Sequence, residues 1–122
     1  MNLGQWRILL VDDDPDYGEM MRTALERAGV FVTYHANAIA ALEAFALSPE
    51  SWDALVTDQA MPQMRGVDLV RAIKAIRPHL PCLLCSGDAL KFEQSPAKLG
   101  VLAVLRKPVR VEQITSLLEG WE

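Results

Sequence analysis

The chain has 122 residues, a length typical of one domain, and 51% of them are hydrophobic, which is enough to form a core. Its formal net charge of −4 argues against a nucleic-acid-binding surface, and its basic residues form no group larger than Arg106, Lys107 and Arg110. Because the first residues lack the features of a signal peptide and no stretch approaches the roughly 18 apolar residues of a membrane span, we expect one cytoplasmic domain over 1–122 that binds neither nucleic acid nor, by itself, a membrane.

The amino-terminal part of the chain predicts a strand followed by a helix. An apolar run over 6–11, interrupted only by Arg7, is typical of a strand that helices cover on both faces. Pro15 favours a helix start, and Gly29 stands where such a helix would be capped. Apolar residues three or four apart form one stripe between them, namely Tyr17, Met20, Met21, Ala24, Leu25 and Ala28.

Two further pairs of strand and helix are expected in the middle of the chain. A strand over 30–35 precedes a helix that begins after the N-cap Asn37 and stops near Ser48. The third strand covers 54–58, and the helix after it ends before Pro78. The buried face of this helix is predicted to contain Leu69, Val70, Ile73 and Ile76.

The carboxyl-terminal part predicts two more strands, over 82–86 and 101–105. Between them, Pro96 allows only a short helix that begins near Ser95, and we expect 88–94 to form a loop in a mobile segment. A last amphipathic helix is expected to bury Val111, Ile114, Leu117, Leu118 and Trp121.

Five short strands that alternate with helices predict an α/β fold with a doubly wound, five-stranded parallel sheet and helices on both faces. We expect the flavodoxin-like strand order 2-1-3-4-5, in which ligands bind at the carboxyl ends of the strands, near the switch point between the first and third strands. Reactive side chains follow four of the five strands at this edge, namely Asp12, Asp13, Asp58, Ser86 and Lys107.

Three acids, a hydroxyl and an ammonium group at one edge suit a divalent cation together with a phosphoryl group. Clustered carboxylates repel one another unless a cation offsets their charge, and Mg²⁺ prefers hard oxygen ligands. A second role follows for Asp58, because a carboxylate can attack a phosphoryl group and form an aspartyl phosphate. Mg²⁺ and Lys107 would neutralise the charge that develops on the phosphoryl oxygens.

Four segments, over 8–15, 57–62, 85–87 and 105–108, resemble the signature of the receiver domain of two-component response regulators, of the chemotaxis-regulator type. The resemblance covers essentially the whole chain. It implies a domain that takes a phosphoryl group from a histidine kinase or a histidine phosphotransfer protein. Its output would pass to a downstream protein partner or to other domains of a parent chain. Because the product is a signal, we do not expect an enzyme.

The resemblance also implies a role for each reactive residue. Asp58 would be the phosphoacceptor, and Ser86 and Lys107 would contact phosphoryl oxygens. The ligands of Mg²⁺ would be Asp12, Asp13, Asp58 and the backbone carbonyl of Ala60. The peptide bond between Lys107 and Pro108 would be cis.

The chain departs from this family at Val104, where many members carry an aromatic residue that moves on activation. A valine has no large ring to move, so we expect a switch to run through backbone shifts in 87–100. The long fourth helix typical of the family is not expected, because Pro96 interrupts it.

Other interpretations remain open. The chain could be a pseudo-receiver that binds partners without being phosphorylated, or the receiver piece of a hybrid sensor histidine kinase. Asp12, Asp14 and Asp16 resemble the nucleophile segment of haloacid-dehalogenase-type phosphatases, but that family needs a second acidic pair that we do not find. The acids over 12–14, which precede Pro15, could also simply cap a helix start. We interpret Cys82 and Cys85 as small hydrophobic residues rather than as a redox pair or half of a zinc site.

Overall fold

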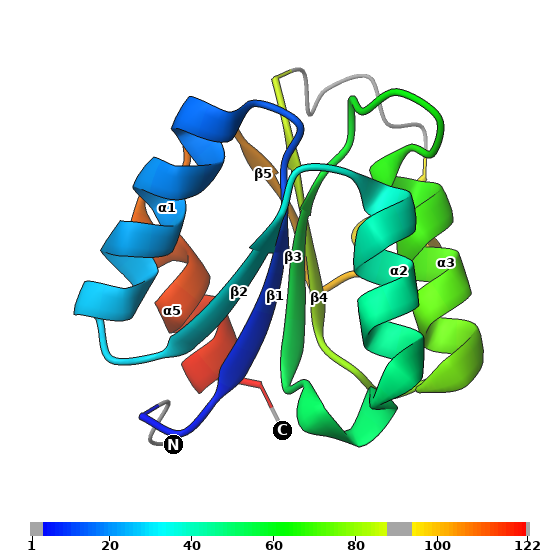
Figure 1. Cartoon of the computed structure of the whole chain (residues 1–122), viewed down its shortest axis with the longest axis horizontal. Helices are drawn as coiled ribbons and strands as arrows, with labels where there is room; N and C mark the ends of the chain where they lie inside the picture. The colour runs from blue at the N-terminus through cyan, green and yellow to red at the C-terminus, as the bar shows by residue number, and fades with distance from the viewer. Residues whose placement is uncertain (1–3, 88–93, 122) are drawn as a thin grey trace.

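The centre of the fold is formed by the strands β1 (Arg7–Val11), β2 (Phe31–His35), β3 (Ala54–Asp58), β4 (Cys82–Ser86) and β5 (Ala103–Arg106). In the computed structural model, which describes residues 4–87 and 94–121, they form one parallel sheet in the order β2-β1-β3-β4-β5. The predicted doubly wound topology is therefore confirmed. The carboxyl ends of the strands lie along the upper edge of the sheet in Figure 1.

Helices cover both faces of this sheet (Figure 1). The helices α1 (Pro15–Arg27) and α5 (Val111–Glu119) pack on one face, and α2 (Ala38–Leu47) and α3 (Gly66–Ile76) pack on the other. The helix α4 (Pro96–Leu99) is a single turn, as the position of its proline predicts. None of the described helices has the length and apolar character needed to cross a membrane.

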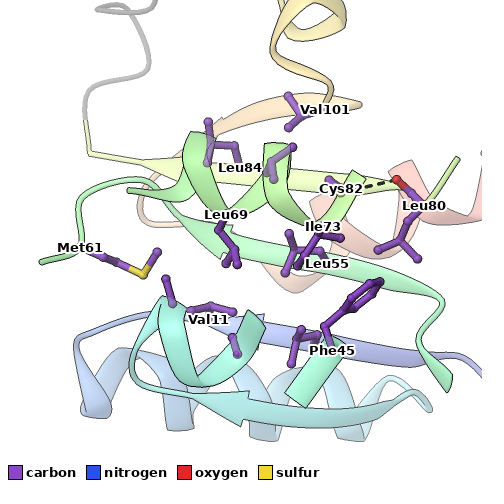
Figure 2. Packing of buried hydrophobic residues seen from close by; sticks show 14 residues of the cluster. Val11, Phe45, Leu55, Met61, Leu69, Ile73, Leu80, Cys82, Leu84 and Val101 are labelled. Carbon is purple, nitrogen blue, oxygen red and sulfur yellow. Dashed lines mark hydrogen bonds between the residues drawn. The ribbon is translucent and has the colours of Figure 1, made fainter. Parts of the chain in front are cut away.

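Alternate residues along the strands supply two hydrophobic cores, one on each face of the sheet. The α1/α5 core contains Ile8, Leu10, Met21, Leu25, Val56, Leu83, Cys85, Ile114 and Leu118, among others. The α2/α3 core contains Leu9, Val11, Phe45, Leu55, Leu69, Ile73, Cys82 and Leu84, among others. Figure 2 shows how side chains of α2 and α3 meet those of the strands in this second core.

Cys82 and Cys85 belong to different cores, because residues three apart in a strand point to opposite faces of the sheet. Both thiols are free and buried. This arrangement confirms the interpretation of the two cysteines as small hydrophobic residues, since they cannot approach each other across β4.

The helix starts are stabilised by side-chain caps. Asp14 caps α1 by accepting hydrogen bonds from the amides of Asp16 and Tyr17. Asn37 caps α2, as predicted, and Ser95 caps α4. A short 3-10 turn follows α2, and the sequence pattern did not predict it.

Strands β2 and β5 begin later than the sequence pattern predicts. The amide of Val30 donates to the carbonyl of Leu25 in α1, so Val30 closes that helix rather than opening β2. Similarly, the amide of Val101 donates to the carbonyl of Pro96, and β5 begins only at Ala103. Turn hydrogen bonds therefore use the amides that would otherwise extend these two strands.

Some predicted details differ or lie outside the described residues. Met20 is 55% exposed and Ile76 is 43% exposed, so neither belongs to the buried helix face on which the apolar pattern placed it. Trp121 lies beyond the end of α5 and makes an edge-on contact with Trp6. The loop predicted over 88–94 lies outside the described residues except for its last position.

Candidate metal centre

The strand order brings the predicted reactive residues to one edge of the sheet. Asp12 and Asp13 follow β1, Asp58 ends β3, Ser86 ends β4, and Lys107 follows β5. Asp12, Asp58 and Ser86 are buried, whereas Asp13 is exposed. The β1–β3 pairing sets the first acids beside Asp58, and the amide of Lys107 donates to the carbonyl of Ser86 at 2.9 Å.

Three carboxylates form the acidic part of the site. One oxygen from each of Asp12, Asp13 and Asp58 lies within 4.8 Å of the others. Lys107 reaches into this group, with its Nζ 2.8 Å from Asp12 Oδ2 and 3.3 Å from Asp58 Oδ2. The ammonium group therefore offsets part of the negative charge.

Burial has the largest effect on the ionisation of Asp58. Burial raises the pKa of Asp58 above its ordinary value, and the charge of Asp12 raises it further, against the opposing effect of Lys107 and the amide of Gln59. Burial lowers the pKa of Lys107, but Asp12 and Asp58 outweigh this effect, so the pKa lies above its ordinary value. Three carboxylates face one ammonium group, so a further cation would relieve the remaining negative charge.

The donor set suits a magnesium ion. Three carboxylates converge, and the exposure of Asp13 leaves one side of the cluster open to water. Mg²⁺ favours such sites because it keeps several waters and takes only a few carboxylate ligands. Ala60 stands two residues after Asp58 on an exposed loop, so its backbone carbonyl lies in the segment next to these acids.

The segment after β3 is held to the start of α3, and this fixes the orientation of Asp58. The amide of Gln59 donates to Asp58 Oδ1 at 3.0 Å, and the side chain of Gln59 accepts from the amide of Val67. Gly66 packs so closely that a Cβ atom there would lie 2.3 Å from the carbonyl oxygen of Asp58. Only glycine fits this position.

The backbone of Asp12 is held from β2 by a tyrosine. The hydroxyl of Tyr34 donates to the carbonyl oxygen of Asp12 at 2.6 Å. Burial, followed by the negative charge of Asp12, raises the pKa of Tyr34, so its hydroxyl stays protonated and able to donate. The ring of Tyr34 lies against Gly18 in α1, where a Cβ atom would lie 2.3 Å from the ring.

A second tyrosine lies next to Lys107. The Nζ atom of Lys107 is 4.5 Å from the centroid of the Tyr17 ring, and the hydroxyl of Tyr17 accepts a hydrogen bond from the amide of Val109 at 2.9 Å. The peptide bond between Lys107 and Pro108 is cis, as the resemblance implies.

Sequence reasoning missed the contributions of Tyr17, Tyr34 and Gln59 to this site. The sequence pattern places Tyr17 in an apolar helix stripe and Tyr34 within a strand, and it assigns neither a role at the site. The available signal is position, because Tyr17 near the start of α1 and Tyr34 near the end of β2 both lie at the edge of the sheet that carries the reactive residues.

Comparison with known proteins gives a consistent result. A family model described as the response regulator receiver domain matches residues 8–119. The chain is 40% identical over 114 residues to the response regulator receiver protein CpdR of Brucella abortus, with 93% of each chain covered. It is 37% identical over 116 residues to a response regulator receiver protein of Anaeromyxobacter, covering 91% of this chain and 46% of that protein.

Solved structures of similar proteins have the same fold. A response regulator receiver domain protein from Clostridium thermocellum matches with a TM-score of 0.84 and 28% identity, covering 93% of this chain and 91% of that chain. A sensor protein from Polaromonas matches with a TM-score of 0.79 and 30% identity, covering 93% of both chains.

Proposed function

This chain belongs to the response regulator receiver domain family, and from that premise we propose that it accepts a phosphoryl group from a phosphohistidine donor onto Asp58 with the help of Mg²⁺. Receiver domains serve two-component signalling as phosphoacceptors. The observation that carries the proposal for this chain is the contact of Asp58 with Lys107 inside a cluster of three carboxylates. The product would be a signal rather than a released metabolite.

In the proposed transfer, a carboxylate oxygen of Asp58 forms a bond to phosphorus while the bond between phosphorus and the donor imidazole nitrogen breaks. The imidazole leaves with the electron pair of that bond. The amide of Gln59 orients the carboxylate through its hydrogen bond to Oδ1. The attacking group must be ionised, and Lys107 favours the ionised form of Asp58.

Positive charge near the phosphoryl oxygens stabilises such a transfer. Lys107 and the hydroxyl of Ser86 would contact two of these oxygens. A bound Mg²⁺ would supply further positive charge as a Lewis acid. Its ligands would be Asp12, Asp13, Asp58 and the backbone carbonyl of Ala60.

The donor would be a histidine kinase or a histidine phosphotransfer protein, as is general for receiver domains. The output would pass to a downstream protein or to other domains of a parent chain. The relatives include both arrangements, since the chain covers 93% of the Brucella protein but 46% of the Anaeromyxobacter protein. We propose a cytoplasmic receiver domain over 1–122. It promotes the transfer of the phosphoryl group from its donor to its own Asp58, without being an enzyme in its own right.

Intact-mass measurement after incubation with Mg²⁺ and acetyl phosphate tests this proposal. We expect one added phosphoryl group on the wild-type chain, none on Asp58→Ala, and one on the control Asp68→Ala, whose carboxylate lies on α3 beside Arg65 and Arg71. An unmodified wild-type chain would overturn the proposal in favour of a pseudo-receiver. Turnover of a phosphomonoester by Asp58→Ala would instead favour a phosphatase.

A further inference from the structure

Among the described residues, two carboxylates and one aromatic ring lie near the ammonium group of Lys107. Its Nζ atom lies 2.8 Å from Asp12 Oδ2, 3.3 Å from Asp58 Oδ2, and 4.5 Å from the centroid of the Tyr17 ring. The face of an aromatic ring attracts a cation within about 6 Å of its centroid. Tyr17 is therefore an uncharged partner for this lysine.

The two carboxylates that contact Lys107 could also bind a metal ion, because Asp12 and Asp58 belong to the cluster that could hold a cation. A carboxylate that turns its charge toward a divalent cation attracts a neighbouring ammonium group less strongly. The ring of Tyr17 cannot bind a hard cation as a carboxylate does, so its attraction for Lys107 persists. The balance among the three partners then shifts toward the ring.

From this geometry we propose that Tyr17 is a positioning residue for Lys107. Its ring holds the ammonium group of Lys107 at the site when Asp12 and Asp58 coordinate a cation. The inference rests on the proposed function, because it assumes that the acidic cluster binds Mg²⁺. It assigns to Tyr17 a role beyond filling space at the edge of the α1/α5 core, against which its ring packs.

Hydrogen bonds hold Tyr17 at both its backbone and its hydroxyl. Its backbone amide donates to the capping side chain of Asp14 at the start of α1. Its hydroxyl accepts from the amide of Val109, two residues after Lys107, and Val109 is buried. The hydroxyl thus joins α1 to the segment that carries the lysine.

A direct test is the NMR chemical shift of the Lys107 ε-methylene protons, assigned by their loss in Lys107→Met. The Tyr17 ring should shift these protons upfield in the metal-free protein, and the shift should persist or grow at saturating Mg²⁺. It should vanish in Tyr17→Leu and remain in Tyr17→Phe, which keeps the ring. Loss of the upfield shift when Mg²⁺ binds the wild-type chain would overturn the proposal, even if the leucine variant does not fold.

A double-mutant cycle on Mg²⁺ affinity separates positioning from packing. By calorimetry, Tyr17→Leu should weaken Mg²⁺ binding about threefold to tenfold, in line with a partly desolvated cation–π contact. Tyr17→Phe should stay within about twofold of the wild type. In the Lys107→Met background, Tyr17→Leu should have no further effect. Equal weakening in both backgrounds, or none in the wild-type background, would contradict the proposal.

Neither measurement needs phosphoryl transfer. A chain that binds Mg²⁺ with the predicted Lys107 shift but is never phosphorylated would overturn the proposed function and support the role of Tyr17. A chain that is phosphorylated although Mg²⁺ removes the Lys107 shift would do the reverse.

Discussion

Asp58 is only 6% exposed and shares its surroundings with the carboxylate of Asp12. Burial is the main reason why its pKa is raised, and Asp12 adds to this effect. A side chain with a raised carboxyl pKa opposes folding when it is ionised, because the unfolded chain solvates the charge better. The ionised carboxylate of Asp58, which phosphoryl acceptance needs, therefore lowers the free energy of unfolding.

An Asp58→Asn variant should be more stable than the wild type in chelator-treated buffer at neutral pH, by about 0.5–2 kcal/mol. The stability that the neutral carboxyl contributes is present below the ordinary pKa of 3.8 and is lost as the pH rises through the higher pKa of the folded state. The advantage of the variant should therefore be larger at neutral pH than in acid and should shrink as the pH falls toward 3.8. Urea unfolding followed by tryptophan fluorescence at several pH values measures it.

Asp16→Asn is the matched control, because Asp16 is an exposed acid near the same edge of the sheet. It should change the free energy of unfolding by less than about 0.5 kcal/mol. An Asp58→Asn variant that is less stable than the wild type at neutral pH would show that Lys107 and Gln59 fully compensate the buried charge.

Lys107 competes with any cation for the carboxylates that it contacts. Lys107→Met should therefore bind Mg²⁺ more tightly than the wild type, on the order of tenfold, because the competing charge is removed. The same variant should be phosphorylated by acetyl phosphate more slowly, on the order of 10²-fold, because one charged contact to the phosphoryl group is lost. Calorimetry measures the Mg²⁺ affinity, and a mass-spectrometric time course measures the phosphorylation rate. If affinity and rate both rose or both fell, the two roles assigned to Lys107 would be contradicted.

At the scale of single elements, α1 and β2 are joined by the contact between Gly18 and Tyr34. A methyl group at Gly18 would lie 2.3 Å from the Tyr34 ring, and that ring carries the hydroxyl that holds the carbonyl of Asp12. Because Gly18 has no side chain, the ring of Tyr34 in β2 can pass α1 and bond to the backbone of Asp12.

Gly18→Ala should destabilise the fold by about 1–2 kcal/mol, because overpacking against Tyr34 outweighs the better helix propensity of alanine. In a Tyr34→Ala background the same substitution should stabilise by up to about 1 kcal/mol, since only the propensity remains. Urea unfolding of the four chains measures this change of sign. Equal effects in the two backgrounds would show that the ring moves away without cost.

The sequence predicts which of the reactive side chains meet, because side-chain chemistry and strand order are enough to bring Asp12, Asp58 and Lys107 to one edge of the sheet. It does not predict the contacts that orient them. The hydroxyl of Tyr34 bonds to a backbone carbonyl, which leaves no trace in the pattern of residue types. Gln59 caps α3 from outside the helix, whose own N-cap residue makes no side-chain hydrogen bond, and such a cap depends on the folded loop.

At the scale of the whole molecule, the sheet separates two cores that must form together, and β4 contributes a cysteine to each. Burial raises the pKa of both Cys82 and Cys85 to about 12. The thiols are therefore protonated and inaccessible in the folded chain at pH 8. Each of them reports on a different face of the sheet.

Both thiols should react with a chromogenic disulfide reagent at the same rate, at least about 10³-fold more slowly than in urea-unfolded chain, because either one becomes accessible only through global unfolding. Stability should also fall as the pH rises from about 9 toward about 12, where the unfolded chain loses thiol protons that the folded chain keeps. Peptide mapping of the labelled sites distinguishes the two cysteines. Faster labelling of one would show that its core opens independently.

The lack of space between Gly66 and the carbonyl of Asp58 has a mechanical consequence. The backbone carbonyl of Gln59 accepts from the amide of Gly66, and its side chain accepts from the amide of Val67, so two hydrogen bonds join the loop after Asp58 to the start of α3. A displacement of the main chain that followed formation of an acyl phosphate at Asp58 would therefore reach the first turn of α3 through these contacts.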